Sequence, residues 1–415
     1  MNSKILTVGD EILIGQIVNT NAAFLGDVLF SIGIPVEKSV TIGDDETMLL
    51  NEFQDSIDNY DVTIITGGLG PTHDDITKPV LIKFFNDELI LNDKVLKHVT
   101  EIFSTRGVPM PATNVGQAMV PAKSKIIWNA NGTAPGIWME KDNKVFIALP
   151  GVPYEMKAMI NDFVVPLLKE KFMKNLDYVL KQKTLLTTGV GESVLNEMMG
   201  DVHSIIKNDK LAFLPSIEGV RLRINVKAES EEKAEERISE IENQIREKIG
   251  EHIFGIGEEI LEEITGKMLS EKNLSISIAE SCTGGLLSSR ITDVSGSSSY
   301  FVGGVVAYSN EFKIKFLDVK EETLREFGAV SEETAKQMAE GVRKHFNTDI
   351  GISITGIAGP GGGTDKKPVG LVYIGYSDKN ITFASKFLFG NFRERNKKRA
   401  AQMALEILRK TLLKL

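Results

Sequence analysis

Short apolar runs that end in glycine-rich or polar turns, each followed by an amphipathic stretch, recur in two separate blocks of this chain. In the first block the runs are KILTVG, DVTIITGG and KVFIALPG, and in the second they begin with LSISIAES. Strands that alternate with helices favour a parallel sheet with crossover helices on its faces. We therefore predict two three-layer α/β domains with mainly parallel sheets, at residues 1–170 and 258–415.

The block between them, residues 171–257, has a different pattern. YVLKQKTLLTTG and GVRLRINVKAE contain stretches of alternating polar and apolar residues, and a long charged segment with an isoleucine stripe follows them. Such a stripe is typical of a helix that covers one face of a small sheet. Its members are Ile238, Ile241, Ile245 and Ile249. We predict a small α+β linking domain, and its glycine-rich turn TTGVGES has no basic flank that would favour RNA binding.

Composition argues against several classes of protein. A net charge of −9 is unfavourable for a general nucleic-acid binder, because contacts to the phosphate backbone need a basic surface. The single cysteine excludes a disulfide framework and a multi-cysteine metal site. No apolar run reaches the ~18 residues of a membrane span, and the start MNSKILTVGDE is not typical of a signal peptide. We expect a cytoplasmic protein without membrane attachment, in which a local pocket can still hold a nucleotide.

Three candidate nucleophiles, Ser281, Cys282 and Thr283, directly follow the second block's first apolar run. A hydroxyl at the carboxyl end of a parallel strand meets the free amides that start the next helix. We expect the amides of Cys282 and Thr283 to form an oxyanion hole there, with helix capping as the alternative role of either hydroxyl. A helix N-terminus also lowers a thiol pKa, but Cys282 has no histidine in reach and ranks behind Ser281.

A serine nucleophile needs a base, and of the five histidines only His345 lies in this block, with His252 at its border. We predict Lys313 as the base, since burial lowers the pKa of an amine, with Tyr308 passing or orienting the proton. Lys315 is the competitor. It shares a face with Lys313 on a strand but not on a helix.

A loop with five glycines, TGIAGPGGGT at 355–364, follows in the same block. Loops that expose backbone amides suit a phosphate or a small polar ligand. A surface turn is the alternative interpretation.

A glycine-rich turn, TGGLGPTHDDITK at 66–78, also follows a predicted strand in the first block. It is typical of a phosphate site. Asp74 and Asp75 within it indicate either a divalent cation or capping of the next helix, and Asp10 and Glu11 would lie at the same sheet edge. The turn-rich segments NVGQAMVP, NANGTAPGIW and LPGVPYEM are expected to wall a cleft.

The motifs AESCTGG, FVGGVVAYSNEFK, TGIAGPGGGTDKKPVGLVYIGY and FRER…RAAQMAL closely resemble the C-terminal domain of the CinA family (competence/damage-inducible protein A), a nicotinamide-nucleotide amidase. The resemblance implies hydrolysis of nicotinamide mononucleotide to nicotinate mononucleotide and ammonia, without a cofactor. Ser281, Tyr308 and Lys313 take the family's catalytic positions. The expected substrate-binding residues are Cys282, Thr283, Gly284, Asn310, Thr355, Gly356, Ala358, Gly359 and Arg393. FGNFRERNKK is one residue longer than the family pattern, so Arg395 competes with Arg393 for the ligand phosphate.

The first block resembles the molybdopterin-binding fold through GDEILIGQIVNTN and TGGLGPTHDDIT, and the N-terminal half of CinA through NGTAPG and LPGVPYEM. The middle block resembles the family's small KH-like domain. Family membership implies metal-dependent hydrolysis of ADP-ribose to AMP and ribose 5-phosphate, with Mg²⁺ or Co²⁺ as the cation. The expected metal ligands are Asp10, Glu11 and Asp75, and the expected substrate-binding residues are Gly67, Gly68, Gly70 and Asn114.

Taken together, we expect a two-site enzyme that acts on small nucleotides, forms a homodimer and makes no direct nucleic-acid contact. Two alternatives stay open. In one, the N-terminal domain binds or adenylylates molybdopterin. In the other, the protein is a non-enzymatic partner protein in DNA uptake or repair.

Overall fold

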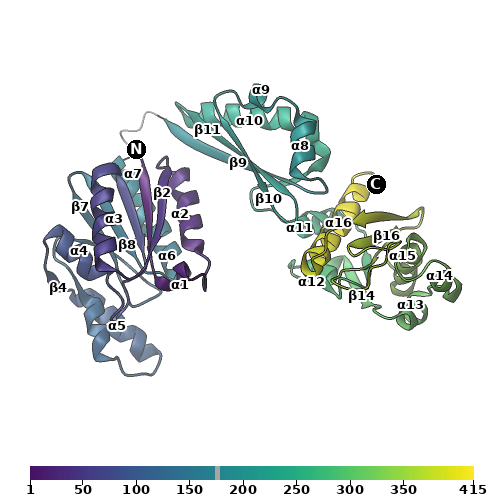
Figure 1. Cartoon of the computed structure of the whole chain (residues 1–415), viewed down its shortest axis with the longest axis horizontal. Coiled ribbons are helices and arrows are strands. Elements are labelled where there is room, and N and C mark those ends of the chain that lie inside the picture. Colours follow the sequence, from purple (N-terminus) through teal and green to yellow (C-terminus); the bar gives the residue numbers. More distant parts are fainter. Residues whose placement is uncertain (173–177) are drawn as a thin grey trace. The chain divides into compact units, whose positions relative to one another are not determined.

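The computed structural model describes residues 1–172 and 178–415. The chain folds into two compact units, residues 1–181 with 227–235 and residues 182–226 with 236–415 (Figure 1). The predicted three-domain organisation is finer than this division and stays a prediction. No helix in the described residues is both long and apolar enough to cross a membrane.

The first unit is built on a six-stranded sheet with the order β2-β1-β3-β8-β7-β6. Strands β2, β1, β3 and β8 pair in parallel, whereas β7 and β6 are antiparallel additions at one edge. The strands are β1 (Ser3–Val8), β2 (Val36–Ile42), β3 (Val62–Thr66), β6 (Lys125–Ile127), β7 (Gly136–Lys141) and β8 (Lys144–Leu149). A side excursion carries the short pair β4 (Leu89–Leu91) and β5 (Met119–Pro121) and the 3-10 helix η1 (Ala112–Ala118).

Helices cover both faces of this sheet. They are α2 (Thr20–Ser31), α6 (Pro153–Met159) and α7 (Val165–Phe172) on one face, and α3 (Glu46–Asn59) and α4 (Thr77–Phe85) on the other. The short α1 (Asp10–Leu13) follows β1, and α5 (Asp93–Thr105) belongs to the side excursion, where it packs with η1. Successive residues of β1 point to opposite faces: Ile5 packs with α2, α6 and α7, and Leu6 packs with α3 and α4. The predicted helix after the first strand is confirmed as α2, whose N-terminus is capped by Asn19.

A four-stranded antiparallel sheet, ordered β10-β11-β9-β12, follows along the chain. Its elements are β9 (Val179–Thr187), α8 (Glu192–Met199), α9 (Val202–Ile206), β10 (Lys210–Pro215), β11 (Val220–Ala228), α10 (Glu231–Ile249) and β12 (Ile253–Ile256). The predicted isoleucine stripe of α10 is buried at all four positions. The expectation of a charged helix with one apolar face is therefore confirmed.

The C-terminal sheet has five strands in the order β14-β13-β15-β16-β17. Strands β14, β13 and β15 are parallel, and β16 and β17 extend the sheet in antiparallel fashion. The strands are β13 (Ile276–Glu280), β14 (Phe301–Val306), β15 (Ile350–Gly356), β16 (Leu371–Ser377) and β17 (Thr382–Leu388). The predicted fold class, two α/β domains with largely parallel sheets and a KH-like domain between them, is confirmed.

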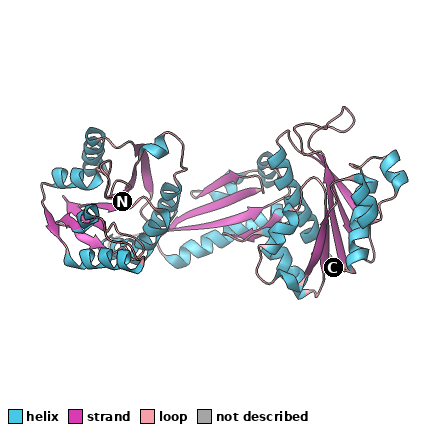
Figure 2. Cartoon of the chain, turned by 90° about the horizontal axis from the view of Figure 1, so that it is seen from below, coloured by secondary structure: helices cyan, strands magenta, loops and turns pink. Residues whose placement is uncertain are grey.

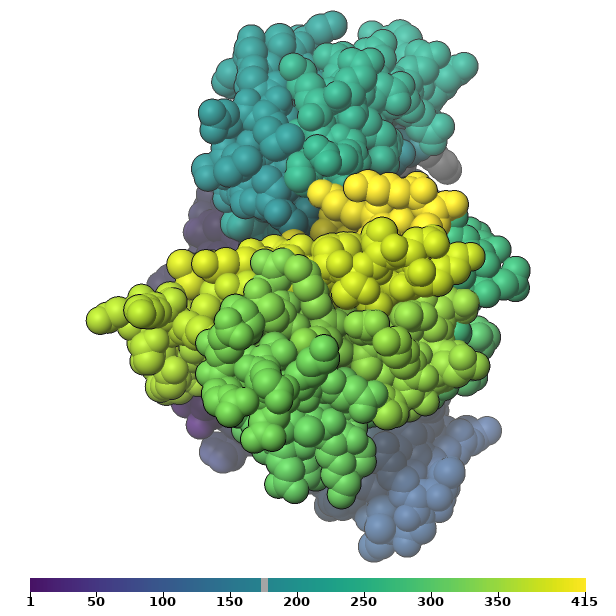
Figure 3. All heavy atoms as spheres, turned by 90° about the vertical axis from the view of Figure 1, so that its right-hand side faces the viewer, coloured from purple at the N-terminus to yellow at the C-terminus, as the bar shows by residue number. Residues whose placement is uncertain are grey.

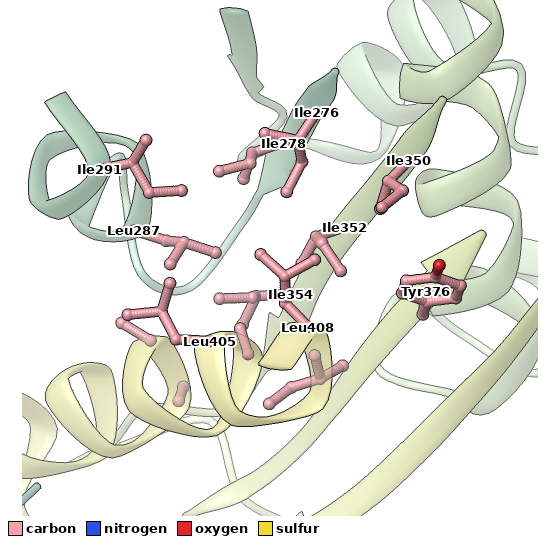
Figure 4. Close-up of a cluster of buried hydrophobic side chains, with 14 of the residues drawn as sticks. Ile276, Ile278, Leu287, Ile291, Ile350, Ile352, Ile354, Tyr376, Leu405 and Leu408 are labelled. Carbon is pink, nitrogen blue, oxygen red and sulfur yellow. The ribbon is translucent and has the colours of Figure 1, made fainter. Parts of the chain in front are cut away.

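Helices flank the C-terminal strands (Figure 2). They are α11 (Leu261–Glu271), α12 (Leu286–Thr292), α13 (Asn310–Leu317), α14 (Glu321–Glu326), α15 (Glu332–Phe346) and α16 (Arg393–Leu412). Leu405 and Leu408 of α16 pack on Ile352 and Ile354 of β15 in the larger core cluster (Figure 4). The second cluster, which includes Met338 of α15, fills the other face of the sheet.

Helix α16 also contacts the four-stranded sheet region within the second unit. Its Gln402 donates to Thr188 Oγ1 at 3.1 Å and accepts from Arg290 of α12 at 2.8 Å. Arg290 in turn pairs with Glu262 of α11 at 2.8 Å. The yellow C-terminal segment forms a band along this part of the molecule (Figure 3). A continuous polar chain therefore joins Thr188 to the helices beneath the C-terminal sheet.

The core under α16 gives a stability prediction. Leu405→Ala should lower the free energy of unfolding of the second unit by about 2–5 kcal/mol, because Leu405 is 1% exposed and its truncation leaves a cavity. Urea unfolding followed by far-UV circular dichroism measures the change. Leu413→Ala is the matched control, since Leu413 is 63% exposed. Equal midpoints for the two variants would contradict the prediction.

Candidate functional site

Three strand ends meet where the candidate nucleophile lies. The Ser281 amide, directly after β13, donates to the Ile354 carbonyl of β15 at 2.9 Å, and the Ala307 amide after β14 donates to the Glu280 carbonyl at 2.8 Å. Because these strands are parallel, their carboxyl ends share one edge of the sheet. The turns that carry Ser281 and Tyr308 are thereby held next to each other.

The structure brings Lys313 and Ser281 together. Lys313 Nζ lies 3.1 Å from Ser281 Oγ, and it donates to the carbonyls of Ala307 at 2.7 Å and Tyr308 at 3.3 Å. Ser281 is 8% exposed and Lys313 is 1% exposed. A neutral amine has two N–H donors and one lone pair. With both donors on carbonyls, the lone pair faces the serine hydroxyl.

Burial lowers the pKa of Lys313 to about 8. Within the described residues Lys313 forms no ion pair with a carboxylate, which would have stabilised the ammonium form instead. Lys315 lies on the same helix, α13, but it is exposed and sits over the Phe316 ring. The helical spacing therefore separates the two lysines and leaves Lys313 as the one beside the serine.

The expectation that helix-start amides face the nucleophile is wrong. Helix α12 begins only at Leu286, and the buried Glu280 carboxylate accepts from its first amides, Gly285 at 3.0 Å, Leu287 at 3.1 Å and Ser288 at 2.8 Å. Ser288 Oγ also donates to Glu280 at 2.7 Å. The positive end of this helix is thus neutralised by the residue that precedes the serine.

The predicted oxyanion donors, the amides of Cys282 and Thr283, are present in the turn before α12 and not in the helix itself. In the described part of the chain neither donates to another residue. The Thr283 hydroxyl is fully buried and has no hydrogen-bond partner in the structure. The turn therefore offers unused donors beside Ser281, as an acyl-transfer site requires.

Tyr308 contacts Lys313 through its carbonyl and not through its phenol. Its hydroxyl instead lies 3.2 Å from Arg393 Nη2, and the tyrosine is 64% exposed. Arg393 also donates to the Gly359 carbonyl at 2.8 Å. Arg395, the competitor of Arg393, stacks on Phe392. Of these two arginines, the structure brings Arg393 to the glycine-rich loop.

Lys397 is a neighbour of the site that the sequence did not single out. It lies one helical turn after Arg393 on α16, and a β-carbon placed on Gly284 would lie 3.8 Å from Lys397 Nζ. The following Lys398 pairs with Glu394 at 2.8 Å. Only the helical spacing from Arg393 distinguishes Lys397 within the basic run.

The remaining predicted substrate residues have different surroundings. Thr355 is buried and donates its hydroxyl to the Ala329 carbonyl at 2.7 Å. Gly356 ends β15, and the Ala358 carbonyl accepts from the buried Asn396 amide at 2.9 Å. Asn310 begins α13 and is exposed. The Thr355 side chain is therefore already engaged, whereas Asn310 is free to meet a ligand.

All of the N-terminal candidate residues except Asp10 and Asn114 line a cavity of about 580 Å³ at the carboxyl ends of β1, β3 and β8. Gly67, Gly68 and Gly70 line it, as do the NGTAPG and LPGVPYEM segments through Thr133 and Gly151. Gly67 has φ +100°, and a β-carbon there would lie 2.1 Å from the Val8 carbonyl oxygen. Glycine is therefore required for the turn to pass this close to β1.

The acidic candidates do not assemble into a ligand group. Asp75 accepts from the amides of Gly70 at 2.7 Å and Thr72 at 2.9 Å, so both its oxygens hold the loop. Burial and the neighbouring carboxylates, Asp10 among them, raise the pKa of Asp44. Within the described residues no three His, Cys, Asp or Glu side chains lie close enough to hold a metal ion. These residues do not fit a preformed cation site.

Two further observations concern the side chains near this cavity. Asn114 lies in η1, is buried and is not among the lining residues. Sequence reasoning missed several polar side chains that do line the cavity, Asn21, Thr66 and Glu155 among them. Their motifs were noted, but no pattern indicates which side chains face inward.

Comparisons with known proteins agree along the whole chain. Family profiles match the CinA C-terminal domain at 258–412, a probable molybdopterin binding domain at 4–170 and the damage-inducible protein CinA KH domain at 182–255. A competence-damage inducible protein of Caldicellulosiruptor saccharolyticus is 46% identical over 413 residues, covering 100% of both chains. The chain belongs to the CinA family.

Other CinA relatives are similarly close. A CinA-like protein of Kosmotoga olearia is 44% identical over 415 residues and covers 100% of both chains. The crystal structure of a competence/damage inducible protein from Agrobacterium tumefaciens is 38% identical, with a TM-score of 0.36, and covers 37% of this chain and 93% of that chain.

The single cysteine of this CinA protein provides a test of the site's environment. Burial raises the pKa of Cys282 to about 11, so at pH 8 the native thiol should react with Ellman's reagent at least about 100-fold more slowly than the unfolded chain. Stopped-flow labelling with and without denaturant measures the ratio. Comparable rates in the two states would contradict the burial of this turn.

Proposed function

We propose that the C-terminal domain hydrolyses the carboxamide of nicotinamide mononucleotide, giving nicotinate mononucleotide and ammonia. The observation that carries this proposal is the 3.1 Å contact between two buried groups, Lys313 Nζ and Ser281 Oγ. No histidine in the described residues hydrogen-bonds to this serine, so the amine is the available base. Membership of the CinA family supports the choice of substrate.

In the first half-reaction Lys313 accepts the Ser281 proton while the serine oxygen attacks the carboxamide carbon. The carbonyl oxygen becomes an oxyanion, and the amides of Cys282 and Thr283 donate to it. The Lys313 ammonium then returns its proton to the carboxamide nitrogen. The C–N bond breaks, ammonia leaves, and the nicotinoyl group remains as an ester on Ser281.

In the second half-reaction Lys313 accepts a proton from water, and the resulting hydroxide attacks the ester carbon. The same turn amides stabilise the second oxyanion. The C–O bond breaks, Ser281 regains its proton from Lys313, and nicotinate mononucleotide leaves. For the 5′-phosphate we propose Arg393 and Lys397, because an arginine and a lysine on one face of α16 supply fixed positive charge beside the glycine-rich loop.

Removal of the nucleophile should abolish the reaction. Ser281→Ala is expected to lower kcat for ammonia release from nicotinamide mononucleotide by at least about 10³-fold, because no covalent intermediate can form. A coupled ammonia assay measures this. Cys282→Ser is the matched control and should retain most activity. Undiminished turnover in Ser281→Ala would assign the attack to a different group.

The pH dependence follows from the Lys313 amine. Only the neutral amine accepts a proton, so with a pKa of about 8 the value of kcat/KM should rise about tenfold per pH unit below pH 8 and level off above it. Initial rates between pH 6 and pH 10 test this expectation. A profile that is flat across pH 8, or that falls as pH rises, would be inconsistent with a lysine base.

For the N-terminal domain we propose hydrolysis of the pyrophosphate of ADP-ribose to AMP and ribose 5-phosphate. The glycine-rich turn at Gly67–Gly70 and the adjoining 580 Å³ cavity support it, since backbone amides suit phosphate groups. Within the described residues the Gly68 and Leu69 amides have no protein acceptor, whereas those of Gly67 and Gly70 donate to Leu149 and Asp75. Both proposed substrates are fragments of NAD, so one chain would serve the salvage of both.

The N-terminal proposal includes a divalent cation, which the experiment below adds or omits. No Lys or Arg lines the cavity among the described residues, whereas Glu11, Asp44, Asp74, Asp75 and Glu155 do. A pyrophosphate bound there would need positive charge from a source other than the residues that line the cavity. Because the carboxylates form no ligand group, no catalytic step is assigned to a bound metal.

Asp75→Ala should abolish AMP release from ADP-ribose and leave ammonia release unchanged, because Asp75 holds the Gly70–Thr72 loop of the first unit. Chromatographic detection of AMP, with Mg²⁺ or Co²⁺ added and with both omitted, measures the effect. Parallel loss of both reactions would instead indicate a global defect. Absence of AMP release by the unmutated protein under every condition would overturn the N-terminal proposal.

A second candidate for the same cavity is molybdopterin binding. The match of residues 4–170 to a probable molybdopterin binding domain favours it. Saturable binding of a pterin together with no turnover of ADP-ribose would support this candidate over the first. The names of the relatives also allow a non-enzymatic role in competence or damage response, which catalysis at either site would argue against.

A further inference from the structure

Asn396, in the first turn of α16, is a buried polar side chain that holds two separate loops by their carbonyls. Its Nδ2 donates to the Ala358 carbonyl at 2.9 Å, in the glycine-rich loop, and to the Gly390 carbonyl at 2.7 Å, in the turn between β17 and α16. The residue is 1% exposed. The two hydrogens of one amide nitrogen therefore bridge segments that are far apart in the sequence.

The orientation of this amide is fixed by its partners. If its nitrogen and oxygen were exchanged, Oδ1 would face two carbonyl oxygens, neither of which has a hydrogen to donate. In the orientation observed, Oδ1 is buried and has no hydrogen-bond partner among the described residues. An apolar side chain would avoid the cost of this unpaired acceptor but would leave both carbonyls without the donor they share. The two donors of Asn396 therefore explain its presence better than packing does.

Arg393, one helical turn before Asn396, holds the same glycine-rich loop. Its Nη1 donates to the Gly359 carbonyl at 2.8 Å, directly after the loop carbonyl that Asn396 holds. The segments are also closely packed, since a β-carbon on Gly370 would lie 2.6 Å from the Gly390 carbonyl oxygen. The glycine-rich loop and the turn before α16 are thus held together at the first turn of this helix.

The anchored carbonyls determine where the next backbone amides point. Both peptide groups, 358–359 and 390–391, are trans, and in a trans peptide group the C=O and the N–H point in opposite directions. The amides of Gly359 and Asn391 therefore point away from the Asn396 side chain. In the described part of the chain neither amide has a protein acceptor, so both remain available to a ligand.

We infer that Asn396 is a positioning residue of the C-terminal site. It fixes the glycine-rich loop on α16, so that the Gly359 amide and the Arg393 guanidinium are presented together to the anionic end of the substrate. With both of its donors on loop carbonyls, Asn396 acts through the loop and not by contact with the ligand. The inference rests on the proposed function, in which Arg393 binds the 5′-phosphate of nicotinamide mononucleotide.

Asn396→Asp tests this role in the full-length protein, because a carboxyl group in either protonation state has at most one hydrogen to donate and so releases at least one carbonyl. In the ammonia assay the KM for nicotinamide mononucleotide should rise at least about tenfold while kcat changes less than about threefold, since the loop contributes binding and not chemistry. The pH midpoint of kcat/KM should stay where Lys313 sets it. Asn380→Asp, the same change at an exposed position between β16 and β17, is the matched control and should leave KM and kcat unchanged.

Hydrogen exchange followed by mass spectrometry gives a second measurement that needs no substrate. In Asn396→Asp the amides of residues 357–371 and 389–392 should exchange at least about tenfold faster, whereas peptides that cover β13 and the Ser281 turn should keep their protection. Asn396→Leu removes both donors without adding charge. It should reproduce the faster exchange and the higher KM if Asn396→Asp is too unstable to assay.

Unchanged exchange of both loops in folded variants overturns the positioning role. An unchanged KM in variants whose loops exchange faster does so as well, and so does a fall in kcat without a rise in KM. Absence of ammonia release by the unmutated protein overturns the proposed function and the role in substrate binding with it. The exchange measurement then decides by itself whether Asn396 anchors the two loops.

Discussion

An amine buried without a carboxylate partner is the constraint on which the C-terminal site depends. Water is lost around Lys313, so its charged form is disfavoured, and the carbonyls of Ala307 and Tyr308 take its two remaining donors. An adjacent carboxylate would stabilise the ammonium and block proton transfer. The carboxylate next to the serine in sequence, Glu280, is held instead by the amides that begin α12. Glu280 thus organises the turn without pairing with Lys313.

The sheet topology explains why these groups meet. Ser281 follows β13, and Lys313 lies one turn into the helix that follows β14, the strand paired in parallel beside it. The third parallel strand, β15, accepts the Ser281 amide. Residues 32 positions apart in sequence are brought to one point by strand pairing alone. The pKa of the Lys313 amine is then set by how deeply the first turn of α13 is buried.

Much of the fold was predictable from the chain. Apolar runs followed by polar turns identified the parallel strands, and the isoleucine periodicity identified α10 and its buried face. The pairing of Lys313 with the Ser281 turn was likewise foreseeable, because few histidines were present and helical spacing separates Lys313 from Lys315. Capping of α12 by Glu280 was not foreseeable, since the sequence does not say how many residues separate a strand from its helix. Nor does a local pattern reveal that both carboxylate oxygens of Asp75 accept hydrogen bonds from its own loop, or that Lys397 faces Gly284.

The polar chain from Thr188 through Gln402 and Arg290 to Glu262 bears on how the small middle sheet should be regarded. Arg290 belongs to α12, whose first amides anchor Glu280 and so fix the position of the serine. The middle sheet therefore supports the position of α12 in the C-terminal domain and does more than connect two domains. A C-terminal half isolated from it would leave the Gln402 amide without its acceptor on Thr188.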